Sequence, residues 1–289
     1  MISDFLIKMT HKQTLRNIII FTAVVALIGW IGVWIDSLLP NQGAHGEPDS
    51  LGAAIWLASP LVTVVLLRTF GGDGWKDMGL KPRLKGNMRW YLLSLLVYPV
   101  IYGITIGLGV YFGWADVSKF RLNAYLPVFG FWIAFEFVKN IFEESVWRGY
   151  LTPKVSLLIK HDWLFYGVVA AIVSLWHIPY YLFFLGDDYL TIFFPYGRGA
   201  MALYSLIVVF CWTPLFVEMF FLTRSLWLCI IMHTVEDALN PLISGGFVRI
   251  PDDKILLISP TYGIIPMTLF LLLGLYLRKR RLALRGNRN

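Results

Sequence analysis

The sequence predicts an all-α membrane protein, a polytopic bundle of about eight transmembrane helices formed by a single integral membrane domain over residues 1–289. Hydrophobic residues make up 57% of the chain and aromatic residues 16%, a composition that soluble proteins rarely have. The apolar runs repeat at lengths of about 20 residues, enough for a helix to cross ~30 Å of hydrocarbon. Unpaired backbone groups find no water there, so each run is expected to be helical.

The expected spans are separated by short polar or basic stretches, and the fourth is expected to continue as helix beyond its apolar part. They cover residues 17–35, 52–69, 90–112, 124–142, 163–185, 200–222, 226–244 and 260–277. The two cysteines, Cys211 and Cys229, fall inside these spans. We expect buried thiols there, and neither a disulfide nor a thiolate metal site.

Basic residues are distributed unevenly over the predicted loops. Of the 25 Lys and Arg residues, 19 lie on the side of the membrane that carries both chain ends and 5 on the other. The positive-inside rule therefore predicts that both termini are cytoplasmic, with loop 43–50 outside. The net charge of +7 sits in these loops, so the expected partner is the lipid bilayer and not nucleic acid. Loop 71–86 is either an interfacial segment on the headgroups or an ordinary connection.

Ionisable residues interrupt three of the predicted spans. They are costly inside a membrane, so they indicate a functional site by default. Those of interest are Glu143, Glu144, Arg148, His177, His233 and Asp237. Carboxylates and imidazoles are the groups that activate water near neutral pH. The alternative is structural: a salt-bridge cluster of the two glutamates with Lys139 and Arg148, and histidines that only hydrogen-bond neighbouring helices.

Helical spacing separates the two adjacent glutamates. Glu144 has Arg148 four residues later, with the carboxylate N-terminal to the cation, which is the favourable order for such a pair. Glu143 points to another side of the helix, toward Trp147. A carboxylate held by a guanidinium is a poor base. We therefore predict that Glu143 is the general base and that Glu144 and Arg148 fix the helix.

The two histidines lie in later spans. His177 comes two residues before Pro179, which removes a backbone hydrogen bond and strains the helix. His233 and Asp237 are four residues apart, so they share one helical face. Glu236 is expected on another face. An imidazole can donate to a developing oxyanion, and an aspartate on the same face can support it if the aspartate is protonated or orients the histidine.

These motifs resemble the type II CAAX prenyl protease family, also called the CPBP intramembrane proteases. The family pattern Glu-Glu-x-x-x-Arg reads from Glu143 to Arg148, and the second motif ends at His177. The third motif reads His233 to Asp237. Val173 stands where the second motif usually has phenylalanine. The resemblance covers about residues 129–240 and implies proteolysis, with the first glutamate of the motif as the catalytic carboxylate.

The predicted reaction is hydrolysis of a membrane-anchored peptide. Glu143, assisted by His177, deprotonates a water that attacks the scissile carbonyl, and His233 and Asp237 stabilise the oxyanion. Arg148 is also suited to a substrate carboxylate. We expect a lipidated or hydrophobic substrate, which enters from the cytoplasmic leaflet into a water-filled cone.

No cofactor is expected, because no His-Glu-x-x-His zinc motif is present. A zinc-dependent version would use His177, His233 and a carboxylate as the three ligands of an open site. The rival functions are a non-catalytic scaffold or bacteriocin-immunity protein of the same fold, and a transporter whose buried charges relay protons. Matching interrupted spans, which are typical of transporter repeats, are not evident in the sequence. The sequence does not define the oligomeric state.

Overall fold

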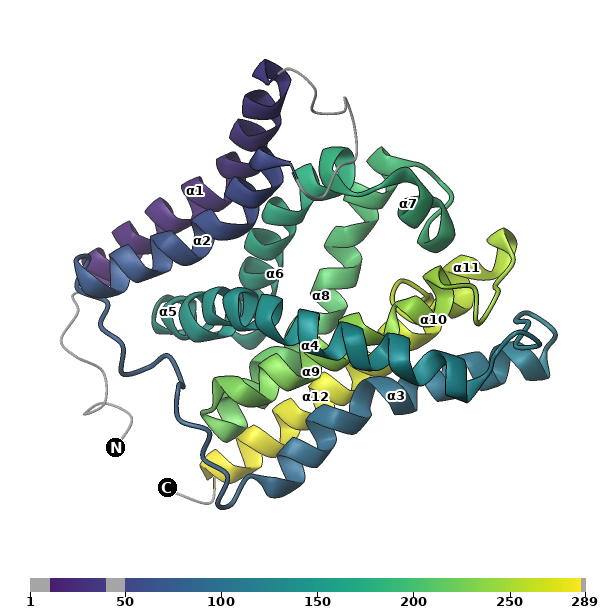
Figure 1. The fold of residues 1–289 in the computed structure, drawn as a ribbon. Coiled ribbons are helices and arrows are strands. Elements are labelled where there is room, and N and C mark those ends of the chain that lie inside the picture. The colour runs from purple at the N-terminus through teal and green to yellow at the C-terminus, as the bar shows by residue number, and fades with distance from the viewer. Residues whose placement is uncertain (1–10, 40–49, 287–289) are drawn as a thin grey trace. The chain divides into compact units, whose positions relative to one another are not determined.

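The computed structural model describes residues 11–39 and 50–286, so most of the loop expected at 43–50 lies outside the described residues. Within them the chain is all-α, as predicted, apart from one isolated bridge between Asp116 and Arg249. The helices are α1 His11–Leu38, α2 Leu51–Thr69, α3 Met88–Tyr111, α4 Leu122–Val146, α5 Thr152–Leu158, α6 Asp162–Pro179, α7 Asp187–Phe193, α8 Arg198–Thr223, α9 Leu226–Leu239, α10 Pro241–Ser244, α11 Asp252–Ile258 and α12 Ile264–Gly286 (Figure 1). Two π-helical turns, Trp147–Leu151 and Tyr180–Phe184, follow α4 and α6 directly.

Seven helical segments of the described chain are long and apolar enough to cross a membrane. They are His11–Leu38, Leu51–Thr69, Met88–Tyr111, Leu122–Leu158, Asp162–Phe184, Arg198–Thr223 and Leu226–Ser244. Each contains or overlaps one of the first seven predicted spans. The fourth continues as helix through the π-helical turn to Leu158, as expected. The chain is therefore a multi-pass membrane protein.

The predicted eighth span differs from the structure. It was placed at 260–277, but helix α12 begins at Ile264 and runs on into the basic tail. Its apolar part ends at Leu277, because four consecutive basic residues follow. The fourteen residues from Ile264 to Leu277 reach roughly 21 Å at ~1.5 Å per residue, which is less than the ~30 Å of hydrocarbon. This helix is consequently not among the seven candidate spans.

The chain forms two compact units, each built from separate stretches of sequence. The first unit contains Met1–Leu80, Phe142–Asp187 and Arg198–Phe210, and the second contains Lys81–Ile141, Asp188–Gly197 and Cys211–Asn289. Helices α4 and α8 each begin in one unit and end in the other. The sequence motifs are divided accordingly: Glu143 to Arg148 and His177 belong to the first unit, and His233 to Asp237 belong to the second.

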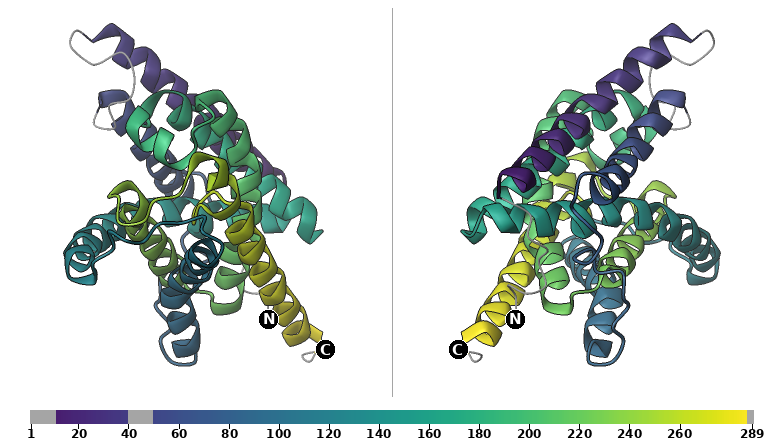
Figure 2. Two further views of the ribbon diagram at one scale, coloured as in Figure 1. Left: turned by 90° about the vertical axis from the view of Figure 1, so that its right-hand side faces the viewer. Right: turned by 90° about the vertical axis from the view of Figure 1, so that its left-hand side faces the viewer.

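In the first unit, α1 and α2 lie side by side (Figures 1 and 2). The two helices approach so closely that a Cβ atom added to Gly52 would lie 2.2 Å from the carbonyl oxygen of Gly32. Small residues permit such backbone approach between membrane helices. The Gly52 amide also donates to the Asp36 carboxylate at 2.7 Å. This contact pairs the first two helices and gives α6 a surface on which to pack.

In the second unit, α3 lies against both α9 and α12. Its core is rich in buried aromatic and sulfur-containing side chains, including Tyr98, Phe216, Met219 and Phe270. The charged end of α12 is held within this unit, because the Arg281 guanidinium donates to both oxygens of the buried Glu218 carboxylate. This core fixes α9, the helix that carries His233 and Asp237.

Candidate active site

The two adjacent glutamates at the end of α4 have different surroundings. Glu144 is wholly buried, and its Oε1 accepts a hydrogen bond from Arg148 Nη1 at 2.8 Å. This is the ion pair that the four-residue spacing predicted. Glu143 is also buried, with 9% of its surface exposed. Two neighbouring carboxylates thus lie in a membrane-spanning helix, and the guanidinium bonds the second of them.

A π-helical turn begins three residues after Glu144. The Thr152 amide donates to the Trp147 carbonyl five residues earlier, and the Thr152 hydroxyl donates to the same oxygen at 2.9 Å. Such wide turns are rare and are frequent at functional sites. Because Arg148 lies within this turn, the local backbone register decides where its guanidinium points.

His177 is placed by its own helix. Its Nδ1 lies 2.9 Å from the Val173 carbonyl oxygen. A carbonyl only accepts hydrogen bonds, so Nδ1 is the donor in this contact. The contact uses the backbone of Val173, so it does not depend on the side chain at that position. A second π-helical turn begins at Tyr180, again three residues after the motif residue.

Aromatic side chains hold this part of α6 in place. Trp56 of α2 stacks on Trp176 with ring centroids 4.1 Å apart, and Trp147 packs edge-on against Trp176 at 5.3 Å. The two stacked indoles also exchange hydrogen bonds: Trp56 Nε1 donates to the Trp176 carbonyl at 2.8 Å, and Trp176 Nε1 donates to the Trp56 carbonyl at 3.2 Å. The packing of Trp147 on Trp176 therefore links the π-helical turn after α4 to the part of α6 that carries His177.

One of these bonds has a clear local cause. The Trp56 carbonyl would accept from the amide of residue 60 in an uninterrupted helix, but residue 60 is a proline and has no N–H. Membrane helices must re-satisfy such carbonyls from neighbouring groups. The Trp176 indole supplies the missing donor, so Pro60 of α2 helps to determine how α6 packs against it.

In the second unit, Asp237 is the centre of the polar contacts. Its Oδ2 accepts from Asn140 Nδ2 at 2.7 Å and from Lys139 Nζ at 3.0 Å, and it lies 3.6 Å from His233 Nε2. Lys139 is also 2.8 Å from Glu136. The Lys139 ammonium therefore lies within ion-pair distance of both the Asp237 and the Glu136 carboxylates. Asn140 was not predicted at all.

The position of the Glu236 side chain differs from the one predicted from the sequence. It was expected on another face of its helix, yet it is buried and accepts from the Tyr102 hydroxyl at 3.3 Å. Its carboxylate lies close to His233 and Asp237, because the three side chains can place one ligand atom each within 4.8 Å of one another. The spacing of three residues between His233 and Glu236 could have revealed this, since such residues also share a face.

One histidine and two carboxylates are ligand types that zinc accepts. This set nevertheless does not fit a divalent metal as it stands. The Asp237 oxygen nearest to His233 is already bonded by the Lys139 ammonium. A metal ion on that oxygen would share it with an ammonium whose nitrogen lies 3.0 Å from the oxygen, and two cations on one acceptor repel each other in a low-dielectric interior. The site is better suited to hold Asp237 as a charged acceptor.

Comparison with known proteins identifies a family for the part of the chain that carries these residues. Residues 125–239 match the family described as Type II CAAX prenyl endopeptidase Rce1-like. The matched segment contains all six predicted site residues, which are Glu143, Glu144, Arg148, His177, His233 and Asp237. No curated protein matches the chain. The part of the chain that carries the candidate site, residues 125–239, is therefore similar to the Type II CAAX prenyl endopeptidase Rce1-like family.

Proposed function

We propose that the protein is an endopeptidase that cleaves membrane-anchored peptides, prenylated CAAX peptides among them, with a water molecule activated by Glu143 and His177. The observation that carries this proposal is the family match, because it spans all the proposed residues. The ion pair of Glu144 also supports it. Glu144 is wholly buried and bonded to Arg148, and a carboxylate held by a guanidinium is a poor base, so we assign the role of base to Glu143.

In the proposed reaction, the Glu143 carboxylate takes a proton from water, and the resulting hydroxide adds to the scissile carbonyl carbon. His177 assists through its imidazole ring, whose Nδ1 is engaged with the Val173 carbonyl. His233, oriented by Asp237, stabilises the oxyanion of the tetrahedral intermediate. The carbon–nitrogen bond then breaks, and the proton taken from water passes to the leaving amine.

We propose that this reaction needs no metal ion. The support is the Lys139 ammonium, which supplies positive charge at Asp237 where a metal would otherwise do so. Arg148 has a second proposed role. Its planar guanidinium can recognise the terminal carboxylate of a substrate peptide in a bidentate manner.

The decisive experiment incubates the purified protein in detergent with prenylated CAAX peptides and a library of membrane peptides, and identifies products by mass spectrometry. Cleavage that is lost in Glu143→Gln and retained in His161→Ala supports the proposal. His161 is a suitable control because it is exposed and lies outside the motifs. A wild-type protein that cleaves none of these peptides, although it is folded and monodisperse, would favour the non-catalytic scaffold or immunity function.

We also propose that both termini and the opening of the site are cytoplasmic, on the basis of the unequal distribution of basic residues. Single cysteines introduced into loops 43–50 and 81–85 of a variant without Cys211 and Cys229 test this. Impermeant reagents applied to intact cells should label the first loop, and the second should react only after the cells are opened. The reverse pattern would overturn the topology.

A further inference from the structure

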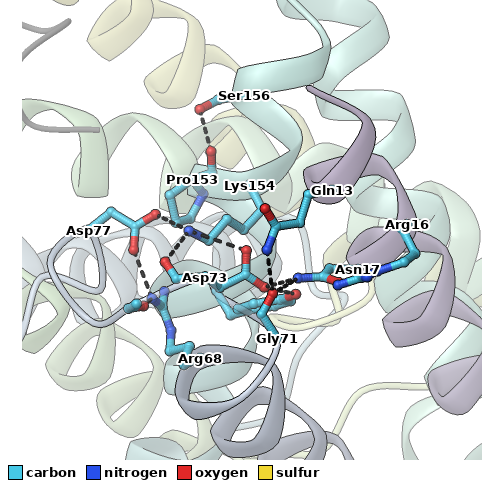
Figure 3. Close-up of polar contacts among 12 residues, drawn as sticks. Gln13, Arg16, Asn17, Arg68, Gly71, Asp73, Asp77, Pro153, Lys154 and Ser156 are labelled. Atoms are coloured by element: carbon cyan, nitrogen blue, oxygen red, sulfur yellow. Dashed lines mark hydrogen bonds and ion pairs between the residues drawn. The ribbon is translucent and has the colours of Figure 1, made fainter. Parts of the chain in front are cut away.

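The first unit buries four ionised side chains that the proposed reaction does not use. Arg68 lies at the end of α2, Asp73 and Asp77 lie in the loop that follows it, and Lys154 belongs to α5. The side chains of Arg68 and Asp73 are fully buried, and those of Lys154 and Asp77 are only 4% and 12% exposed. We call these four residues the loop cluster; Figure 3 shows them with their partners.

The charges of the loop cluster compensate one another. Arg68 Nη1 lies 2.7 Å from one oxygen of Asp77, and Lys154 Nζ lies 2.8 Å from the other. Lys154 also donates to the Asp73 carbonyl at 2.9 Å. Burying ions is costly before they are paired, and a hydrophobic replacement is often as stable. The cluster is therefore better explained by the geometry that it imposes than by stability alone.

Hydrogen bonds from α1 hold the loop on its other side. Asn17 donates to the Asp73 carboxylate and to the Gly71 carbonyl, both at 3.0 Å, and Gln13 donates to the same carbonyl at 2.9 Å. Figure 3 shows both amide side chains pointing at Gly71. Residues 71–77 of the loop are thus held between α1 and α5.

The fixed loop contacts the π-helical turn at consecutive residues. The Tyr150 hydroxyl donates to Asp73 Oδ2 at 2.8 Å. Arg68 Nη2 donates to the Gly149 carbonyl. Met78 packs on the same glycine, because a Cβ atom there would lie 3.1 Å from its Cγ. The loop cluster and Met78 therefore contact both the backbone and a side chain of this turn.

The sequence explains why an arginine reaches the Gly149 carbonyl. In an uninterrupted α-helix this oxygen would accept from the amide of residue 153, which is a proline. Arg68 supplies the donor that Pro153 lacks, in the same way that Trp176 supplies the one missing at Pro60. The guanidinium fork serves two acceptors at once, since it also binds Asp77. A lysine would keep the charge but not this geometry.

We propose that the loop cluster positions the π-helical turn, and through it Arg148 and Glu144, for the proteolysis proposed above. The inference rests on the proposed function. The loop cluster touches neither substrate nor water in this scheme. Arg148 lies one residue before Gly149, so a shift of the turn moves the guanidinium that fixes Glu144 and is proposed to meet the substrate carboxylate. A displacement of about 1 Å at such a site can cost on the order of 100-fold in rate.

Two mild substitutions test this role. Arg68→Lys retains the positive charge and loses the fork, and Tyr150→Phe removes one hydroxyl. We expect kcat to fall roughly 10- to 100-fold in Arg68→Lys, and less in Tyr150→Phe. Amide hydrogen exchange should rise at residues 147–152 and stay unchanged in α9. Arg68→Lys should add little to the loss in an Arg148→Lys background, because both substitutions act through the same turn.

Two control variants separate positioning from stability. Ser156→Ala removes a hydroxyl that donates to the Pro153 carbonyl at 2.8 Å, and kcat should not change. Arg281→Lys weakens a buried ion pair in the second unit and should lower the melting temperature without raising exchange at 147–152. Wild-type kcat in Arg68→Lys and Tyr150→Phe would overturn the positioning role. So would an equal fall of kcat in Arg281→Lys. An inactive wild-type protein would instead overturn the proposed function.

Discussion

The two units place their candidate catalytic residues in different ways. In the first unit, both motif helices change to π-helical turns three residues after a motif residue, at Trp147 and at Tyr180. In the second unit, α9 is a regular helix, and His233 and Asp237 are neighbours through its ordinary periodicity. The first unit fixes its side chains by irregular backbone and distant donors, whereas the second uses helical spacing and two side chains from α4.

The candidate residues of the two units therefore depend on different kinds of contact. Around Arg148 and His177, carbonyls are satisfied by Arg68 and by the indoles of Trp56 and Trp176. Around Asp237, charge complementarity from Lys139 dominates. Substitutions in the first unit should therefore change the cleavage rate and the stability by different amounts. Substitutions in the second unit should act mainly by changing the charge around Asp237.

The largest effect is expected at Glu143. Glu143→Gln should lower turnover by about 10²–10⁴-fold, since it removes the proposed general base. Substrate should still bind, and the melting temperature should barely change. Rate, substrate affinity and thermal unfolding of the purified variant test this. If Glu143→Gln turns over normally while Glu144→Gln is dead yet fully stable, the roles of the two carboxylates are reversed.

A comparable loss is expected from either histidine. His177→Ala and His233→Ala should each reduce cleavage by about 10²–10⁴-fold without unfolding the protein, through loss of acid–base and oxyanion stabilisation. His161→Ala, on an exposed side chain, is the control. Monodisperse variants that cleave at the wild-type rate would show that these histidines are structural, and the contrast between the units would then concern packing alone.

Glu144 is expected to affect stability as well as rate. Glu144→Gln leaves the buried Arg148 short of its partner, and breaking a buried pair costs on the order of 3–5 kcal/mol. Asp187→Asn is a matched control, because Asp187 also pairs with an arginine but its side chain is 75% exposed. That substitution should cost at most about 1 kcal/mol. Equal shifts in melting temperature for the two variants would contradict the distinction.

A smaller effect is expected at Lys139. Lys139→Met removes one of the two donors to Asp237 and should lower activity about 10-fold, the scale typical of residues that orient a catalytic group. Asn140 remains as the second donor.

The wild-type protein should keep full activity after prolonged chelation. Stoichiometric zinc whose removal and return switch activity off and on would contradict the metal-free proposal and the assigned role of Lys139.

Much of the fold could be predicted from the sequence, because membrane-spanning helices are recognised by their length and their apolar composition. The ion pair of Glu144 with Arg148 and the proximity of His233 to Asp237 followed from four-residue spacing in the same way. The adjacency of Glu236 to Asp237 predicts different faces, but its three-residue spacing from His233 brings the two side chains together. The predicted eighth span included residues 260–263, which precede the helix start at Ile264.

Other features were beyond local periodicity. The π-helical turns depend on tertiary contacts that no three- or four-residue spacing encodes. The prolines at 60 and 153 were visible in the sequence, but the donors that compensate for them come from Trp176 and Arg68, which are far away in the chain. Likewise, Lys139 and Asn140 lie about a hundred residues from Asp237, so their pairing could not be read from spacing.

The loop cluster also constrains how the protein is made. Asp73 and Lys154 are separated by 81 positions, which corresponds to roughly 4–16 s of synthesis at ~5–20 residues per second. During that interval Asp73 and Asp77 await the second cation of their cluster. The ion pairs of the loop cluster can therefore be completed only after α5 has been synthesised.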